Sequence, residues 1–178
     1  KKEMGPNYYS MNIGSYHYLM LDDIITTGPK SKDNPAQSYV GKFGFTYAID
    51  TEQMEGIKKD LSYVPKDMGI VIAMHVPFWQ ICGLKDGELQ YKYTAASSYD
   101  PQPLLDLVSG WRDVQFLTGH WHHTEVIPIA DNITEHVHCS ASAVSWKIND
   151  IGAPMVCDDG TPAGCQIYKV EGDRMSWQ

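Results

Sequence analysis

Two apolar runs in the middle of the chain predict buried strands. The first spans residues 69–74 and the second spans residues 114–118, and both contain β-branched or aromatic side chains. Pro77 follows the first run closely and Gly119 ends the second, so each strand is expected to stop there.

A helix is expected between these two strands. Asp100 is placed to cap it, Pro101 stands at its first position, and apolar side chains lie along one side of residues 100–108. A strand, helix, strand unit with the usual right-handed crossover makes the two strands parallel. Their C-terminal ends then open on one edge of the sheet, where ligand sites of α/β proteins form.

Three histidines follow the predicted ends of these strands. His75 follows the first strand, and His120 and His122 follow the second. On extended backbone, residues i and i+2 share a face, so His120 and His122 are expected to converge on one ion or on two neighbouring ions, while His123 points elsewhere. Because a strand-end histidine is also commonly a polar cap, the hypothesis of a metal site depends on the three meeting.

The segments around these histidines resemble the calcineurin-like metallophosphoesterases, which include purple acid phosphatases and Ser/Thr protein phosphatases. The matching segments are residues 73–77, Ala-Met-His-Val-Pro, and residues 117–122, Leu-Thr-Gly-His-Trp-His. In that family, a histidine after one strand and the two histidines of a Gly-His-x-His motif complete a site for two metal ions. The resemblance implies that His75 and His120 bind one ion and that His122 binds the other, the ions being Mn, Fe or Zn.

The resemblance extends over most of the chain and is closest to bacterial envelope-type members. Residues 5–14 and 17–22 match paired strands, residues 50–61 match a helix with an apolar stripe, and residues 159–173 match a turn and closing strands. It implies an α/β fold in which two mixed sheets pack together and helices cover the outside. Residues 1–178 are expected to form a single domain, the C-terminal portion of such a two-sheet sandwich.

The chain lacks three motifs with which the family completes its metal site: Asp-x-His, Gly-Asp-x-x-Asp and Gly-Asn-His-Asp/Glu. Neutral imidazoles do not offset the charge of two ions, which lie roughly 3.5–4 Å apart in two-metal sites, so carboxylates are also required. We therefore expect this chain to be the C-terminal part of a longer enzyme, inactive without its missing N-terminal half. Asp22 ends a predicted strand, but a loop cap is the more typical role of such a residue.

The expected reaction is metal-dependent hydrolysis of a phosphoester, either a small molecule or a phosphoprotein. Two ions bind the phosphoryl oxygens, lower the pKa of a bound water to near 7, and direct it in line at phosphorus. No catalytic residue is assigned in this chain, although His123 is a candidate to orient a metal ligand. Two alternatives stay open: a non-catalytic fragment or binding module with one ion or none, and a mononuclear zinc hydrolase.

Further histidines and aromatic residues are given other roles. His136 and His138 alternate with Val137, and we expect a half-exposed strand with its polar residues outward rather than a metal pair. Phe78 and Trp79 follow His75 on a loop, where they form either a substrate wall or part of the core.

Charge and cysteine content narrow the picture a little further. The net charge of −8 argues against a nucleic-acid backbone as the partner, and no apolar run approaches the length of a membrane span. Cys157 and Cys165 bracket a turn-rich loop that a disulfide would close, which would suit a periplasmic or secreted protein, and reduced thiols are equally consistent. Residues 26–37 and 83–99 are expected to be flexible loops.

Overall fold

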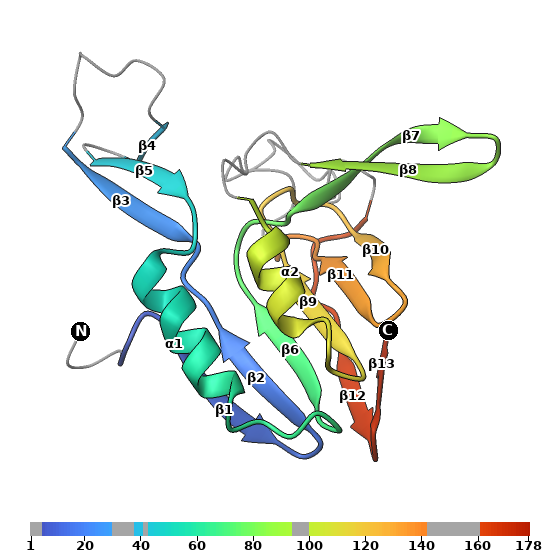
Figure 1. The fold of residues 1–178 in the computed structure, drawn as a ribbon. Helices are drawn as coiled ribbons and strands as arrows, with labels where there is room; N and C mark the ends of the chain where they lie inside the picture. Colours follow the sequence, from blue (N-terminus) through green and yellow to red (C-terminus); the bar gives the residue numbers. More distant parts are fainter. Residues whose placement is uncertain (1–4, 30–37, 41–42, 94–99, 142–160) are drawn as a thin grey trace.

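Figure 1 shows the computed structural model, which describes residues 5–29, 38–40, 43–93, 100–141 and 161–178. The protein is of mixed α/β type, and strands predominate. The helices are α1 (Thr51–Leu61) and α2 (Gln102–Val108). The strands are β1 (Tyr9–Ile13), β2 (Tyr16–Met20), β3 (Ile24–Pro29), β4 (Ser38–Val40), β5 (Phe43–Tyr47), β6 (Gly69–Ala73), β7 (Trp79–Lys85), β8 (Glu88–Tyr93), β9 (Val114–Thr118), β10 (Glu125–Ala130), β11 (Ile133–Val137), β12 (Tyr168–Glu171) and β13 (Arg174–Trp177).

The main sheet has six strands in the order β1-β2-β6-β9-β11-β10. Its four inner strands are parallel, whereas β1 and β10 run antiparallel at the edges. The two strands expected from the apolar runs are therefore confirmed as β6 and β9, together with their parallel pairing. As a result, the C-terminal ends of β2, β6, β9 and β11 lie along one edge of the sheet.

Both helices cover one face of this sheet (Figure 1). Helix α1 spans nearly the expected residues, and the Asp50 carboxylate caps it by accepting a hydrogen bond from the Gln53 amide. Helix α2 begins at Gln102, so Pro101 takes the cap position expected for Asp100. The Asp100 carboxylate still accepts a hydrogen bond from the Gln102 amide, 3.0 Å away.

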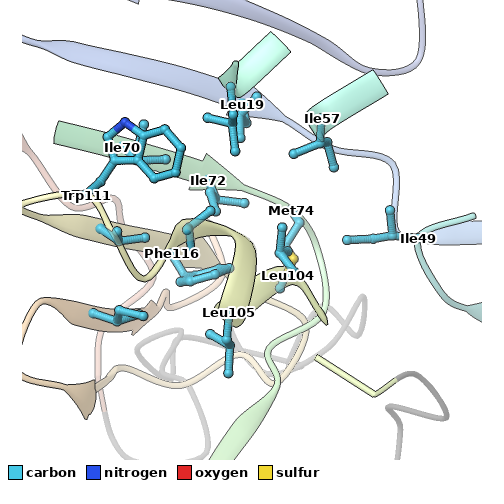
Figure 2. Close-up of a cluster of buried hydrophobic side chains, with 14 of the residues drawn as sticks. Leu19, Ile49, Ile57, Ile70, Ile72, Met74, Leu104, Leu105, Trp111 and Phe116 are labelled. Atoms are coloured by element: carbon cyan, nitrogen blue, oxygen red, sulfur yellow. The ribbon is translucent and has the colours of Figure 1, made fainter. Parts of the chain in front are cut away.

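The apolar core lies between the two helices and the sheet (Figure 2). Phe116 of β9 is at its centre, fully buried, with Ile70 and Ile72 of the neighbouring strand β6. The side chains that the helices contribute to this core are Met54, Ile57, Leu61, Leu104, Leu105 and Val108. At the start of β6, a Cβ on Gly69 would fall 2.1 Å from the buried ring of Tyr16, so glycine is required for the close approach of β2.

The opposite face of the main sheet is covered by the hairpin β12-β13. The rings of Tyr168 and Trp177 pack against His136, with centroids 5.4 and 4.4 Å away. The Arg112 guanidinium and the Tyr16 hydroxyl both donate to the carbonyl of Asp173 in the hairpin turn. The described residues thus form one six-stranded sheet with the two-stranded sheet β12-β13 against its other face, and a sandwich of two mixed sheets stays a prediction.

Two smaller sheets extend beyond the C-terminal edge of the main sheet, β3-β5-β4 and β7-β8 (Figure 1). They correct the expectation of flexible loops, because residues 24–29 form a strand and residues 79–93 form a hairpin. The Asp86-Gly87 pair is the sequence signal for this hairpin, and both residues have positive φ, as a two-residue Asp-Gly turn requires. The remaining parts of those two stretches lie outside the described residues.

Two further expectations concern the disulfide and the membrane span. Cys157 is outside the described residues, and so is the disulfide considered between it and Cys165. Among the helices that the structure describes, none is long and apolar enough to cross a membrane.

Candidate metal centre

The parallel pairing of β6 and β9 brings two of the predicted ligands together. Backbone bonding continues past the ends of both strands, where the Met74 amide donates to the Leu117 carbonyl and the Gly119 amide donates to the His75 carbonyl. As a result, Nε2 of His75 lies 3.1 Å from Nδ1 of His120. The two rings stand edge to face, with centroids 5.0 Å apart.

The backbone of the Gly-His-Trp-His-His segment is tightly turned. The Trp121 amide donates to the Gly119 carbonyl at 2.7 Å, and His120 between them has φ of 65°. An i to i+2 bond around a residue with positive φ is a γ-turn of the rare, strained kind. His122 also has a left-handed backbone, with φ of 57°. Our expectation of extended backbone was therefore wrong, because the chain turns sharply as soon as β9 ends.

This strain marks the segment as a candidate functional site. Non-glycine residues with positive φ are uncommon, and they persist only where the surrounding structure holds them. In this chain, two of the three non-glycine residues with positive φ among the described ranges are His120 and His122, both predicted as ligands. The edge-on packing of Trp121 against His120, with centroids 4.9 Å apart, helps to hold the turn.

Neither His122 nor His123 takes part in the contact between His75 and His120. The charge of His122 contributes to the electrostatics of His120, but no group of three His, Cys, Asp or Glu side chains suited to a metal ion is found within the described ranges. His123 lies with Nε2 at 3.2 Å from the Glu125 carboxylate, at ion-pair distance but without the alignment of a hydrogen bond. His123 is therefore placed to pair with Glu125.

Burial lowers the pKa of His120 below its ordinary value, and the nearby charges of His75 and His122 lower it further. The ring is therefore neutral at physiological pH, which is the form that binds metal ions. On its other side, Nε2 of His120 lies 3.4 Å from the hydroxyl of Tyr47, at the end of β5. Tyr47 was not singled out in the sequence, because nothing in its neighbourhood distinguishes it from a core tyrosine.

Two buried carboxylates beside the histidines were also missed. The sequence drew attention to Asp22, whose carboxylate instead accepts from the Asn7 side chain and the Ile24 amide, as a loop cap does. Asp23 is the buried one, 6% exposed, and it accepts hydrogen bonds from the amides of His75 and Val76. The period-two alternation that points Leu19 inward continues to Asp23, and this was the available signal.

Glu135 is the second such carboxylate. It lies on β11, is 0% exposed, and accepts hydrogen bonds from the amides of Phe78 and Trp79. Phe78, 4% exposed, packs on the ring of Phe116, so it belongs to the core, and Trp79 is partly buried beside it. The signal for Glu135 was its position between the buried residues Ile133 and Val137 on one strand face.

The neighbours of Glu135 correct another expectation. Strand β11 is an inner strand of the sheet rather than half exposed, and His136 is fully buried with its Nε2 donating to the Gln115 side chain. Burial lowers the pKa of His136 to about 4. His138 contacts the Thr118 carbonyl and the Tyr168 hydroxyl. The two imidazoles thus contact other groups and do not face a common ion.

Glu135 should give the protein a stability component that depends on pH. Burial raises the pKa of its carboxyl from 4.5 to about 7, against the opposing effect of the two amide donors. Between these pH values the folded protein keeps a proton that the unfolded chain has released, so the free energy of unfolding should fall as the pH rises. The shift corresponds to about 3 kcal/mol.

Urea unfolding of the protein and of Glu135→Gln, each at pH 4.5 and at pH 8, measures this component. We expect the free energy of unfolding to decline over this window in the parent by more than in the variant, because glutamine does not titrate. An equal decline in both proteins would show that Glu135 does not carry the component.

No protein-family model and no curated protein matches this chain.

Proposed function

We propose that this chain supplies histidine ligands to a two-metal phosphoesterase of the calcineurin-like class. The observation that carries the proposal is the contact between His75 and His120, the two residues that the family motifs assign to one ion. They come from neighbouring parallel strands, at the edge of the sheet where α/β proteins bind their ligands. The strained turn around His120 is a second, independent support.

The geometry of the pair fits a shared metal ion. Two nitrogen ligands about 2.0–2.1 Å from one ion are roughly 2.9–3.4 Å apart, for angles between about 90° and 110°. The nitrogens of His75 and His120 are 3.1 Å apart. In the metal-free protein the same distance allows an N–H···N hydrogen bond, since a neutral imidazole has one donor and one acceptor. The pair is therefore held at ligand spacing before a metal binds.

Each residue of the site has a distinct role in this proposal. His75 and His120 would bind one ion, and His122 the other, with carboxylates supplied from a part of the protein that carries the remaining family motifs. The Tyr47 hydroxyl oxygen, beside Nε2 of His120, would accept a hydrogen bond from Nε2–H, so that Nδ1 is left free to bind metal. The bound ions would provide an activated water and charge stabilisation for hydrolysis at phosphorus.

The proposal is tested by measuring metal content and turnover together. Bound Mn, Fe and Zn, and hydrolysis of an aryl phosphate monoester and diester, are determined for the 178-residue chain and for a protein extended upstream. We expect two ions per molecule and turnover in the extended protein only, with both lost on chelation and restored by added metal. The ratio of monoester to diester turnover then indicates the substrate class.

Three outcomes would contradict the proposal. An extended protein that binds no metal, or an upstream sequence without Asp-x-His and Gly-Asp-x-x-Asp, would exclude a site of this class. Turnover by the 178-residue chain that depends on a single equivalent of zinc would favour a mononuclear zinc hydrolase instead.

A further inference from the structure

The five residues that begin at His75 have an unusual set of hydrogen-bond acceptors. Pro77 has no amide hydrogen, and each of the other four residues donates its amide to a side-chain carboxylate. The Asp23 oxygens accept from His75 at 3.1 Å and from Val76 at 2.6 Å. The Glu135 oxygens accept from Phe78 at 2.9 Å and from Trp79 at 3.1 Å. Two carboxylates thus hold every amide hydrogen of residues 75–79, which we call the anchored segment.

The two carboxylates hold the anchored segment from opposite sides of β9. Asp23 follows β2, which pairs with β6 on one side, whereas Glu135 is on β11, beyond β9 on the other side. The anchored segment therefore runs from the end of β6 past the end of β9, and it is fixed on both sides of the strand that carries His120. Its first residue is His75, whose side chain contacts His120.

Burying the two carboxylates costs free energy unless their oxygens accept hydrogen bonds. A buried carboxylate is stabilised when amide donors satisfy its oxygens, so the four amide donors offset part of the cost of burying the two side chains. Asp23 and Glu135 each use both oxygens on the anchored segment. An apolar pair would fill the same space, but it would leave four buried or half-buried amides without these acceptors.

We propose that Asp23 and Glu135 are positioning residues, which fix the anchored segment so that His75 is held at ligand distance from His120. The expected effect on metal binding rests on the proposed function. The expected effect on the contact between the two imidazole rings does not, because that contact is present in the metal-free protein.

The test uses Asp23→Asn and Glu135→Gln in the protein extended upstream. Each change keeps the size of the side chain but replaces one acceptor oxygen with an amide group that only donates, so one backbone amide loses its partner. Glu125→Gln is the matched control. Glu125 is also a partly buried carboxylate of this region, yet its contacts are with His123 and with the Ile81 amide, outside the anchored segment.

Three readouts are compared by NMR and calorimetry. Hydrogen exchange should be faster by at least roughly tenfold at the amide of His75 or Val76 in Asp23→Asn, and at that of Phe78 or Trp79 in Glu135→Gln. The nuclear Overhauser contact between the His75 and His120 rings should weaken in the metal-free protein. Affinity for Zn²⁺ or Mn²⁺ should fall by roughly 10–100-fold, as for other groups that orient a metal ligand. Glu125→Gln should leave all three within about twofold of the parent.

The outcomes separate the two proposals. If the parent binds no metal, the proposed function fails, and the ring contact still decides whether the carboxylates position His75. Faster exchange with an unchanged ring contact and unchanged metal affinity would mean that Asp23 and Glu135 only stabilise the fold, and would overturn the inference. Because the two variants act from opposite ends of the anchored segment, one that folds suffices for the test.

Discussion

In the proposed metal centre, replacing His120 with asparagine should reduce the metal affinity of the protein extended upstream by more than about 100-fold, beyond the effect of losing a group that merely orients a ligand. Turnover should fall with it. Asparagine is chosen because His120 has φ of 65°, a left-handed conformation that asparagine adopts more readily than alanine does. The imidazole is therefore removed with little added backbone strain, and the free energy of unfolding should change by less than about 1 kcal/mol.

Calorimetric titration with Zn²⁺ or Mn²⁺ and a parallel urea unfolding curve measure both quantities. The matched control is His138→Gln, which removes another strand-end imidazole with two hydrogen-bond contacts, outside the candidate centre. That variant should lose stability but keep its metal affinity. Equal metal affinities for His120→Asn and the parent would exclude His120 as a ligand.

Replacing Phe116 with alanine should have the largest effect on stability, a loss of about 3–5 kcal/mol in the free energy of unfolding. The ring is fully buried in β9, packs 5.8 Å from the ring of Phe78, and lies between the sheet and helix α2 (Figure 2). Its removal leaves a cavity that strands on both sides prevent from closing, so both the lost burial and the cavity contribute.

Denaturant unfolding with a constant m-value is the appropriate measurement. Phe116→Leu keeps most of the buried volume and should cost much less, because a leucine fills part of the same space. A loss below about 1 kcal/mol for Phe116→Ala would show that the core relaxes around the missing ring.

The elements that the sequence predicted are those with strong patterns. Strands β6 and β9 are continuous apolar runs that Pro77 and Gly119 end, helix α2 has a capping pattern and an apolar side, and helix α1 was expected from the family resemblance and its apolar stripe. The parallel pairing followed from the intervening helix, and with it the meeting of His75 and His120. These predictions needed only local pattern and one rule of chain connection.

The features that were missed depend on what a side chain contacts. The residue type of His120 does not predict its positive φ, so extended backbone was expected where the structure has a turn. Asp23 and Glu135 look like ordinary polar residues of a loop and a strand, because their partners are backbone amides that are distant in sequence. His136 was placed outward since the hairpin that covers it comes some 30 residues later in the chain.

The parallel order of the main sheet also has a consequence for folding. The pairing of β2 with β6 joins Tyr16 to Gly69, and that of β6 with β9 joins Ile70 to Val114, so both are contacts between distant parts of the chain. Sheets built from such contacts close long loops before they gain stability, and they form slowly. Refolding should therefore be slow, and the proposed ligands His75 and His120 should meet only after the central strands have paired, too late for a metal ion to act as an early template.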